Sequence, residues 1–173
     1  MRQEEESQIL NGAGGNDLEG LLGRIPGANL GMISGAADRN MLDDIYAAIT
    51  KVRSAFLEPD GIVMHPDDWA TVQTLKDDMG RYLGVGPFAG ENSERLWGKR
   101  VVVTAAIARG TALVGAFATG AQIFRRGGLS VEASNSHADF FQKNKTAIRA
   151  EERLALAVYR PQAFATADLD LVS

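Results

Sequence analysis

The side chains of this chain that could carry acid–base or metal chemistry are few and far apart. It has two histidines, His65 and His137, and no cysteine. His65 stands immediately before Pro66, a position that favours a capping or turn role at the start of a helix. His137 and Asp139 form an H-x-D pair, but structural and catalytic metal sites need three or four ligands. The pattern therefore predicts neither a metal centre nor a catalytic base.

Two glycine-containing segments loosely match nucleotide-binding patterns. Residues 84–89, Gly-Val-Gly-Pro-Phe-Ala, fit G-x-G-x-x-A. They follow a predicted helix instead of a strand, and Pro87 removes an amide that a phosphate would need. Gly98-Lys99 lacks the upstream glycine of a P-loop, because position 93 is a serine. No serine stands in a G-x-S-x-G elbow. We therefore expect no catalytic residue and no cofactor, and the chain does not read as an enzyme.

Composition restricts the class of protein further. The chain has 173 residues, of which 45% are hydrophobic, enough for a sizeable core. Its net charge of −4 argues against a dedicated nucleic-acid binder, which needs a concentrated basic face. No apolar run approaches the ~20 residues of a membrane span. The first residues lack the basic and then apolar order of a secretory signal. We expect a globular cytoplasmic protein that is not embedded in a membrane.

The longest alternation of apolar and polar residues runs from residue 145 to residue 165. A period of two predicts a strand with one buried face. At about 13 residues it would be roughly twice the usual length of 5–6. Charges of alternating sign along it favour a strand that reaches a neighbouring chain, although an edge strand with a solvated face is the simpler alternative. The predicted subunit contacts on this strand are Arg149, Glu151 and Arg153.

The middle of the chain predicts helices and short strands. Asn40 or Asp38 is a suitable N-cap for a helix over residues 41–56, which has one apolar face. Residues 62–64 predict a buried strand, and Pro66 opens a second helix whose first turn carries two aspartates. Three further features are expected after it: a strand at 100–104 with residues 112–117 running back, a hairpin of 121–125 with 129–133 about the turn 126–128, and a polar link at 135–140.

Residues 81–98 predict a long loop. Loops of this length in a small domain are usually functional or mobile. Exposed aromatic residues on such a loop are suited to anchoring a subunit contact, although a loop folded back on itself is equally compatible. The predicted contact residues here are Arg81, Tyr82 and Phe88.

Six stretches together resemble the C-terminal part of tailed-phage major capsid proteins of the HK97-like family. No single stretch is specific, but all six occur in the family's order with suitable spacing. They are residues 10–12 (LNG) with 18–22 (LEGLL), 62–69 (IVMHPDDW), 75–83 (LKDDMGRYL), 96–104 (LWGKRVVVT), 110–117 (GTALVGAF), and 140–149 with Arg153 and residues 160–164 (RPQAF).

The resemblance implies an α+β fold of the HK97-like capsid type. An axial lobe, residues 38–137, would be inserted into a partial peripheral lobe, residues 1–37 and 138–173, that holds the long β-strand. The loop at residues 81–98 would point to a symmetry axis. Clustering of helices and short strands in the middle of the chain independently agrees with an inserted lobe.

The resemblance also implies a function and partners. The chain would be a structural subunit that self-associates into pentamers and hexamers, found in the virion and assembled in the bacterial host cytoplasm. Packaged DNA would be only an indirect partner, beside portal and scaffold or protease proteins. The family's N-terminal arm, extended hairpin loop and most of its long helix have no counterpart here, so residue 1 is expected to fall inside a domain. Cross-linking through a lysine of that loop is not expected.

Two other functions remain open from the sequence. An encapsulin-type compartment shell of bacteria shares the fold but packs enzyme cargo. A small non-capsid binding domain would instead be a monomer stabilised by its ligand.

Overall fold

A six-stranded mixed sheet forms the centre of the fold. The computed structural model describes residues 2–15, 17–31, 40–84, 94–137 and 139–169. The sheet has the order β1-β10-β5-β2-β4-β3, with β2 parallel to β4 and antiparallel to β5. Its strands are β1 (Leu30–Gly31), β10 (Phe164–Asp168), β5 (Thr111–Gly115), β2 (Gly61–Met64), β4 (Lys99–Val103) and β3 (Arg95–Leu96).

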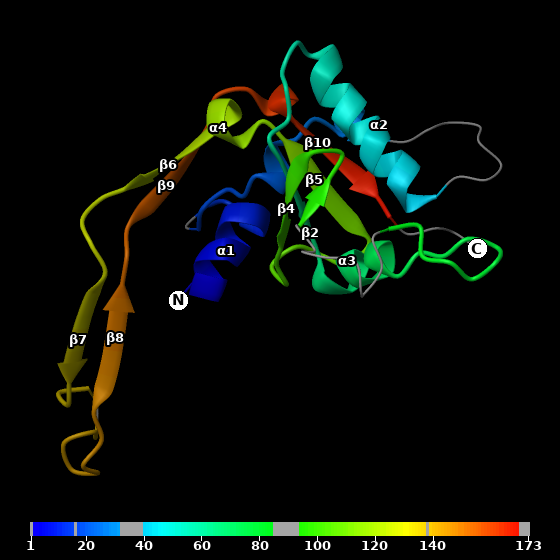
Figure 1. Ribbon diagram of the computed structural model, residues 1–173. Helices are drawn as coiled ribbons and strands as arrows, with labels where there is room; N and C mark the ends of the chain where they lie inside the picture. The colour runs from blue at the N-terminus through cyan, green and yellow to red at the C-terminus, as the bar shows by residue number, and fades with distance from the viewer. Residues whose placement is uncertain (1, 16, 32–39, 85–93, 138, 170–173) are drawn as a thin grey trace.

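Helix α2 (Met41–Ser54) covers one face of this sheet (Figure 1). Asn40 caps it as predicted: its side chain accepts a hydrogen bond from the Asp43 N–H, and the Asp43 carboxylate accepts one from the Asn40 N–H. This capping box satisfies two backbone donors that the first turn leaves without helical partners. The apolar stripe of the helix then faces the sheet, where Ile45, Ile49 and Val52 are almost completely buried.

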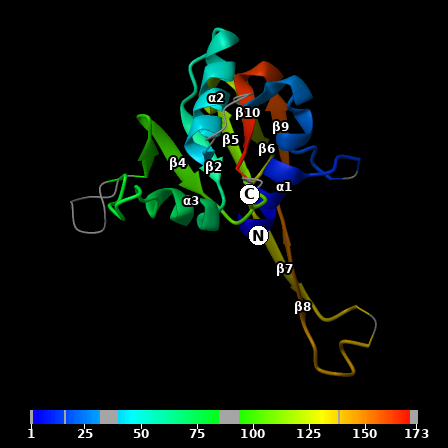
Figure 2. The same cartoon turned by 90° about the vertical axis from the view of Figure 1, so that its right-hand side faces the viewer.

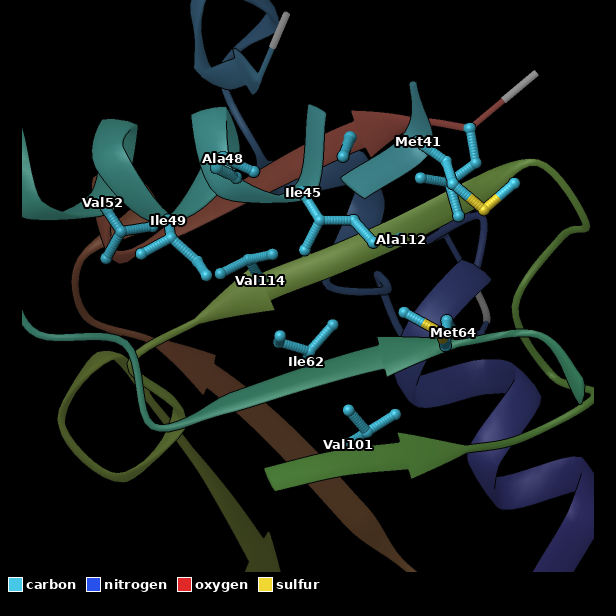
Figure 3. Close-up of a cluster of buried hydrophobic side chains, with 13 residues drawn as sticks. Met41, Ile45, Ala48, Ile49, Val52, Ile62, Met64, Val101, Ala112 and Val114 are labelled. Carbon is cyan, nitrogen blue, oxygen red and sulfur yellow. The ribbon is translucent and has the colours of Figure 1, made fainter. Parts of the chain in front are cut away.

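Side chains along each strand point alternately to the two faces of the sheet, so the hydrophobic core has one part on each face. Ile62 and Met64 of β2, and Val101 of β4, point toward α2 and pack against its apolar stripe (Figure 3). The intervening residue Val63 points to the other face. Successive side chains of a strand project to opposite faces, so both sides of the sheet need a cover.

Helix α1 (Arg2–Asn11) and the segment after it cover part of that second face. This segment contains the short helices η1 (Leu22–Arg24) and η2 (Gly27–Asn29). Leu10 and Leu21 pack there with Leu113 of β5 and Phe164 of β10. Three short helices complete the fold: α3 (Pro66–Gln73), α4 (Phe117–Gly120) and η3 (Pro161–Ala163). Helix α3 begins at Pro66, as predicted, and ends at Gln73.

The predicted single long strand is wrong. Two strands, β8 (Ala147–Glu151) and β9 (Leu154–Val158), occupy it, with residues 152 and 153 between them. The predicted hairpin at 121–133 is also wrong: β6 (Ala121–Arg125) pairs with β9, and β7 (Ser130–Ser134) pairs with β8. The four strands make one long two-stranded ribbon that extends away from the sheet (Figure 1).

The ribbon is interrupted because its two sides have unequal numbers of residues. Arg125 pairs with Leu154 and Ser130 pairs with Glu151. The four residues 126–129 therefore lie opposite the two residues 152 and 153, and the ladder cannot continue. Gly127 has a φ of 79°, a backbone conformation for which glycine has no steric penalty. Glycine at such a position therefore occurs both in a bulge of a ribbon and in a hairpin turn, and the sequence does not distinguish the two.

The strand at residues 112–117 does not pair with the strand at 100–104. Strand β5 runs back relative to β4, but β2 lies between them and pairs with both. The C-terminal strand β10 pairs with the other side of β5. The sheet therefore takes strands from both predicted lobes, and the division at residues 37 and 138 stays a prediction. Within the described residues, no helix is long and apolar enough to cross a membrane.

Candidate subunit-contact surface

Strands β6 and β9 anchor the ribbon to the rest of the molecule. Leu156 of β9 is buried against Leu10 of α1. The Arg125 guanidinium binds two carboxylates, one from Glu5 of α1 and one from Glu152 between β8 and β9. This arrangement neutralises part of the acidic face of α1 and fixes the direction in which the ribbon leaves the sheet.

The outer half of the ribbon, β7 with β8, has one polar and one apolar face. Cross-strand pairing places Glu132 opposite Arg149 and Ala133 opposite Ile148. Val131 and Ile148 belong to the apolar face and are exposed, Ile148 by 75%. A two-stranded ribbon in water is marginal without a hydrophobic partner. The outer half of the ribbon therefore has an apolar face that none of the described residues covers.

The predicted contacts Arg149 and Glu151 lie on the polar face of this outer half. An Arg149 guanidinium nitrogen is 2.8 Å from a Glu132 carboxylate oxygen, and its Nε is 3.4 Å from a Glu151 carboxylate oxygen. Both charges therefore have partners inside the chain. Pairs this exposed contribute little to folding.

Arg153, the third predicted contact on this stretch, stands in the interruption between β8 and β9. Its carbonyl accepts a hydrogen bond of 2.9 Å from the Arg126 N–H, while its side chain is exposed. That side chain lines a groove of about 420 Å³ together with Glu4, Glu5 and Gln8 of α1. The groove is acidic on the α1 side, so Arg153 is its basic border.

The predicted contacts Arg81 and Tyr82 form a turn beyond α3. The Asp77 carboxylate accepts hydrogen bonds from the Met79 N–H, the Arg81 N–H and the Arg81 Nε. These bonds, above all the one from the Arg81 backbone, hold the pKa of Asp77 below its ordinary value. The Lys76 ammonium lies 4.7 Å from the centre of the Tyr82 ring. The turn is therefore an ordered element that holds its exposed side chains in place.

The structure separates the predicted contacts into two groups. Arg81 and Tyr82 belong to the segment that follows α3. This segment lies on the opposite side of the sheet region from β7 and β8, the outer ribbon that carries Arg149 and Glu151 (Figure 2). Phe88 lies outside the described residues. Part of the predicted loop is a strand: β3 pairs with β4 through a two-residue turn at Trp97 and Gly98, both with positive φ.

The most perturbed carboxylate of the described residues is Glu58, near the end of α2. Two Arg53 guanidinium nitrogens donate to it at 2.9 and 3.1 Å, and the Lys99 ammonium also binds it. The hydrogen bonds from Arg53, followed by that from Lys99, lower the pKa of Glu58 to about 2. This cluster ties α2 to β4 and has no arrangement suited to turnover.

The two histidines have the surroundings of structural residues. His65 Nδ1 accepts a hydrogen bond of 3.2 Å from the Asp67 N–H and caps α3, which confirms the capping role. His137 stacks edge-on against Phe140, with 5.3 Å between the ring centres. In the part of the chain that the structure describes, no three His, Cys, Asp or Glu side chains are grouped to hold a metal ion.

Sequence reasoning missed the apolar residues of the outer ribbon as contact candidates. Val131 was assigned to a hairpin strand, and Ile148 to the buried parity of a long strand. The alternation did contain the signal, because Ile148 and Ala150 have the same parity as buried Leu156. What it could not show is that the cover for Ile148 is absent from the described part of the chain.

Comparison with known proteins identifies the family. The sequence profile of the Phage capsid family matches residues 1–169. The chain belongs to the Phage capsid family. One curated member, the major capsid protein of Enterobacteria phage HK97, is 42% identical over 160 residues. The match includes 92% of this chain and 41% of that protein, so the chain spans less than half the length of this Phage capsid family relative.

Solved structures confirm the HK97-like α+β fold of this Phage capsid family member. The capsid of an empty GTA particle matches 97% of the chain and 62% of its own length, with a TM-score of 0.72 and 22% identity. Gordonia phage Cozz matches 98% of the chain and 59% of its own length, with a TM-score of 0.75 and 13% identity. The virus-like particle from Pyrococcus furiosus matches 96% and 63%, with a TM-score of 0.63 and 14% identity.

Proposed function

We propose that this chain is a structural part of a phage or prophage major capsid protein, which self-associates into pentamers and hexamers of an icosahedral shell. The observation that carries the proposal is the outer ribbon, whose apolar face is bare in the described part of the chain. Its family membership and its 42% identity to a major capsid protein support the same role. The role involves no catalytic turnover.

The same proposal implies specific partners for the shell. The shell would enclose DNA, which this chain of net charge −4 would meet only indirectly. Portal, scaffold and protease proteins would be partners during assembly in the host cytoplasm, and the virion would be the final location. A phage shell is favoured over an encapsulin-type compartment because the curated relative is a phage major capsid protein.

Light scattering on a sizing column, with negative-stain images of the early fractions, tests the proposal. We expect rings or shells. The variant Ile148→Glu places a charge on the apolar face of the ribbon and is expected to shift the population to monomers. Ser134→Glu is the matched control, because it adds the same charge to the polar face of the same strand pair. A monomer at every concentration, or equal effects of both variants, would contradict the proposal.

A further inference from the structure

The aromatic ring of Phe56 has no cover in the described part of the chain. Phe56 follows α2 and is 98% exposed. Its φ of 60° lies in the left-handed region, at a position where helices usually end with glycine. Its N–H donates to the Arg53 carbonyl at 2.9 Å, so the helix end forms despite the strained backbone. Within the folded chain, both the left-handed backbone of this phenylalanine and the exposure of its apolar ring to water are energetically unfavourable.

An apolar hollow lies on the face of the sheet opposite α2. It has a volume of about 390 Å³ and lies between the first residues of β2, the edge of β4 and helix α4. Val63 lies on this face, and its partner on β4, Val102, is 43% exposed. Gly61 has no side chain, and a Cβ there would be 3.3 Å from the Phe117 ring. The hollow is therefore an uncovered part of the core-forming sheet.

The charged residues at the border of the hollow favour an aromatic occupant. The Asp60 carboxylate is satisfied, because it accepts hydrogen bonds of 2.9 Å from the Phe117 and Ala118 N–H groups. Arg100 is exposed, and none of the described hydrogen bonds or ion pairs includes its side chain. A guanidinium beside an apolar floor is suited to lie over the face of an aromatic ring.

We propose that Phe56 of one copy of this chain inserts into the hollow at Val63, Val102 and Phe117 of a second copy. This contact rests on the proposed function, because it requires self-association. A phenylalanine buries roughly 150–250 Å² when covered, and such a residue in a pocket is typical of interface anchors. The second copy is the occupant that the chain itself supplies, since every copy carries both the ring and the hollow.

Because the proposed function requires rings of identical chains, this contact is head-to-tail and not a reciprocal two-fold pairing. Phe56 stands at the end of the helix that covers one face of the sheet, and the hollow opens on the other face. Two different surfaces of identical chains therefore meet. A contact of this kind leaves one ring and one hollow free on a dimer, so it continues until it closes into a ring.

Engineered cysteines test the contact directly, because the chain contains none of its own. Phe56→Cys and Val102→Cys are prepared as separate variants, mixed and oxidised. We expect disulfide-linked dimers only in the mixture, since a disulfide requires Cα atoms within ~7 Å. Cross-linking of Phe56→Cys with itself would indicate a two-fold contact and overturn the proposal. Phe56→Cys mixed with Ile148→Cys is the control and should remain unlinked.

A second variant separates folding from association. Phe56→Gly should raise the thermal unfolding midpoint of the monomer, because it relieves the left-handed strain, and should weaken association by about tenfold or more. Unchanged association would overturn the proposal. If oligomers form but positions 56 and 102 do not cross-link, only this inference is wrong. If the chain stays monomeric, the proposed function is wrong as well.

Discussion

The ring of Phe164 occupies the space in which a Cβ atom on Gly115 would lie. An ideal Cβ on Gly115 would be 2.3 Å from Phe164 Cδ1. The two residues are cross-strand partners of β10 and β5, and Phe164 is completely buried. Its ring also packs edge-on against Phe117, with 5.3 Å between the ring centres. A glycine at position 115 is thus what allows β10 to pack its aromatic residue against the sheet.

We predict that Gly115→Ala destabilises the fold by about 1–3 kcal/mol, because the added methyl group displaces a buried ring that has no free space around it. Urea unfolding followed by tryptophan fluorescence measures the loss. Gly23→Ala is the control, since nothing lies within 4 Å of a Cβ at that position. Equal stability of the two variants would show that the packing around Phe164 is looser than described.

Asn40→Ala should remove the cap of α2 and destabilise the chain by about 1 kcal/mol. The Asn40 side chain accepts a hydrogen bond of 3.0 Å from the Asp43 N–H. Alanine removes this side-chain acceptor, so that the Asp43 N–H keeps only the Asn40 backbone carbonyl. Asn40→Asp retains an acceptor and should keep most of the stability. The thermal unfolding midpoints of the native chain and the two variants measure the effect. If Asn40→Asp lowers the midpoint as much as Asn40→Ala, the lost cap is not the cause.

The stability contribution of Glu58 should depend on acid pH. Its pKa falls from an ordinary 4.5 to about 2 in the folded chain. A lowered folded-state pKa contributes stability above the unfolded pKa, and the contribution disappears as the pH falls through the folded pKa. The advantage of the native chain over Glu58→Gln should therefore be complete at pH 5.5 and shrink between about pH 4.5 and 2. Unfolding midpoints across this range measure it, and a constant difference would contradict the assignment.

Reversal of Arg153 should weaken association without unfolding the monomer. Its exposed side chain belongs to none of the described ion pairs, so Arg153→Glu breaks no pair described within the chain. Sedimentation velocity is expected to show a shift toward monomers, with an unchanged circular dichroism spectrum. Arg109→Glu is the control for a charge reversal away from the ribbon; Arg109 lies 3.7 Å from the exposed Asp67 carboxylate, a pair that contributes little to stability. Unaltered sedimentation of Arg153→Glu would count against a contact at this position.

Hydrogen exchange should divide the monomer into two parts. The amides of β2 and β5 lie in the middle of the sheet beneath α2 and should exchange slowly. Those of β7 and β8 belong to a ribbon in which all residues but Ala147 are exposed, and they should exchange orders of magnitude faster. Assembly should protect β7 and β8. Exchange that stays equally fast in the assembled particles would show that the outer ribbon is not buried there.

Local rules predicted the elements whose signals are contained within a few residues. The cap at Asn40, the proline at the start of α3 and the buried strand at residues 62–64 all depend on neighbours in the sequence. Pairing between strands does not. The glycines after Arg126 indicate a break in regular structure, but the sequence does not show whether the chain turns back there or continues through a bulge.

The contact surface was predictable in part for the same reason. Alternation located the strand that carries Arg149 and Glu151, because parity is a local property. The bare apolar face required knowledge of what packs against it. The prediction that Phe56 belongs to the apolar face of the helix at residues 41–56 is wrong. The helix ends at Ser54, and Phe56 has a positive φ and an exposed ring.

The described edges of the central sheet have a consequence for how copies can join. Its outermost strands, β1 and β3, have only two residues each. Strands so short offer too few free backbone groups to recruit a strand from another molecule. The ribbon instead presents five-residue strands with open outer edges. The longest unpaired strand edges among the described residues therefore belong to the ribbon, and we expect backbone pairing between copies to form there.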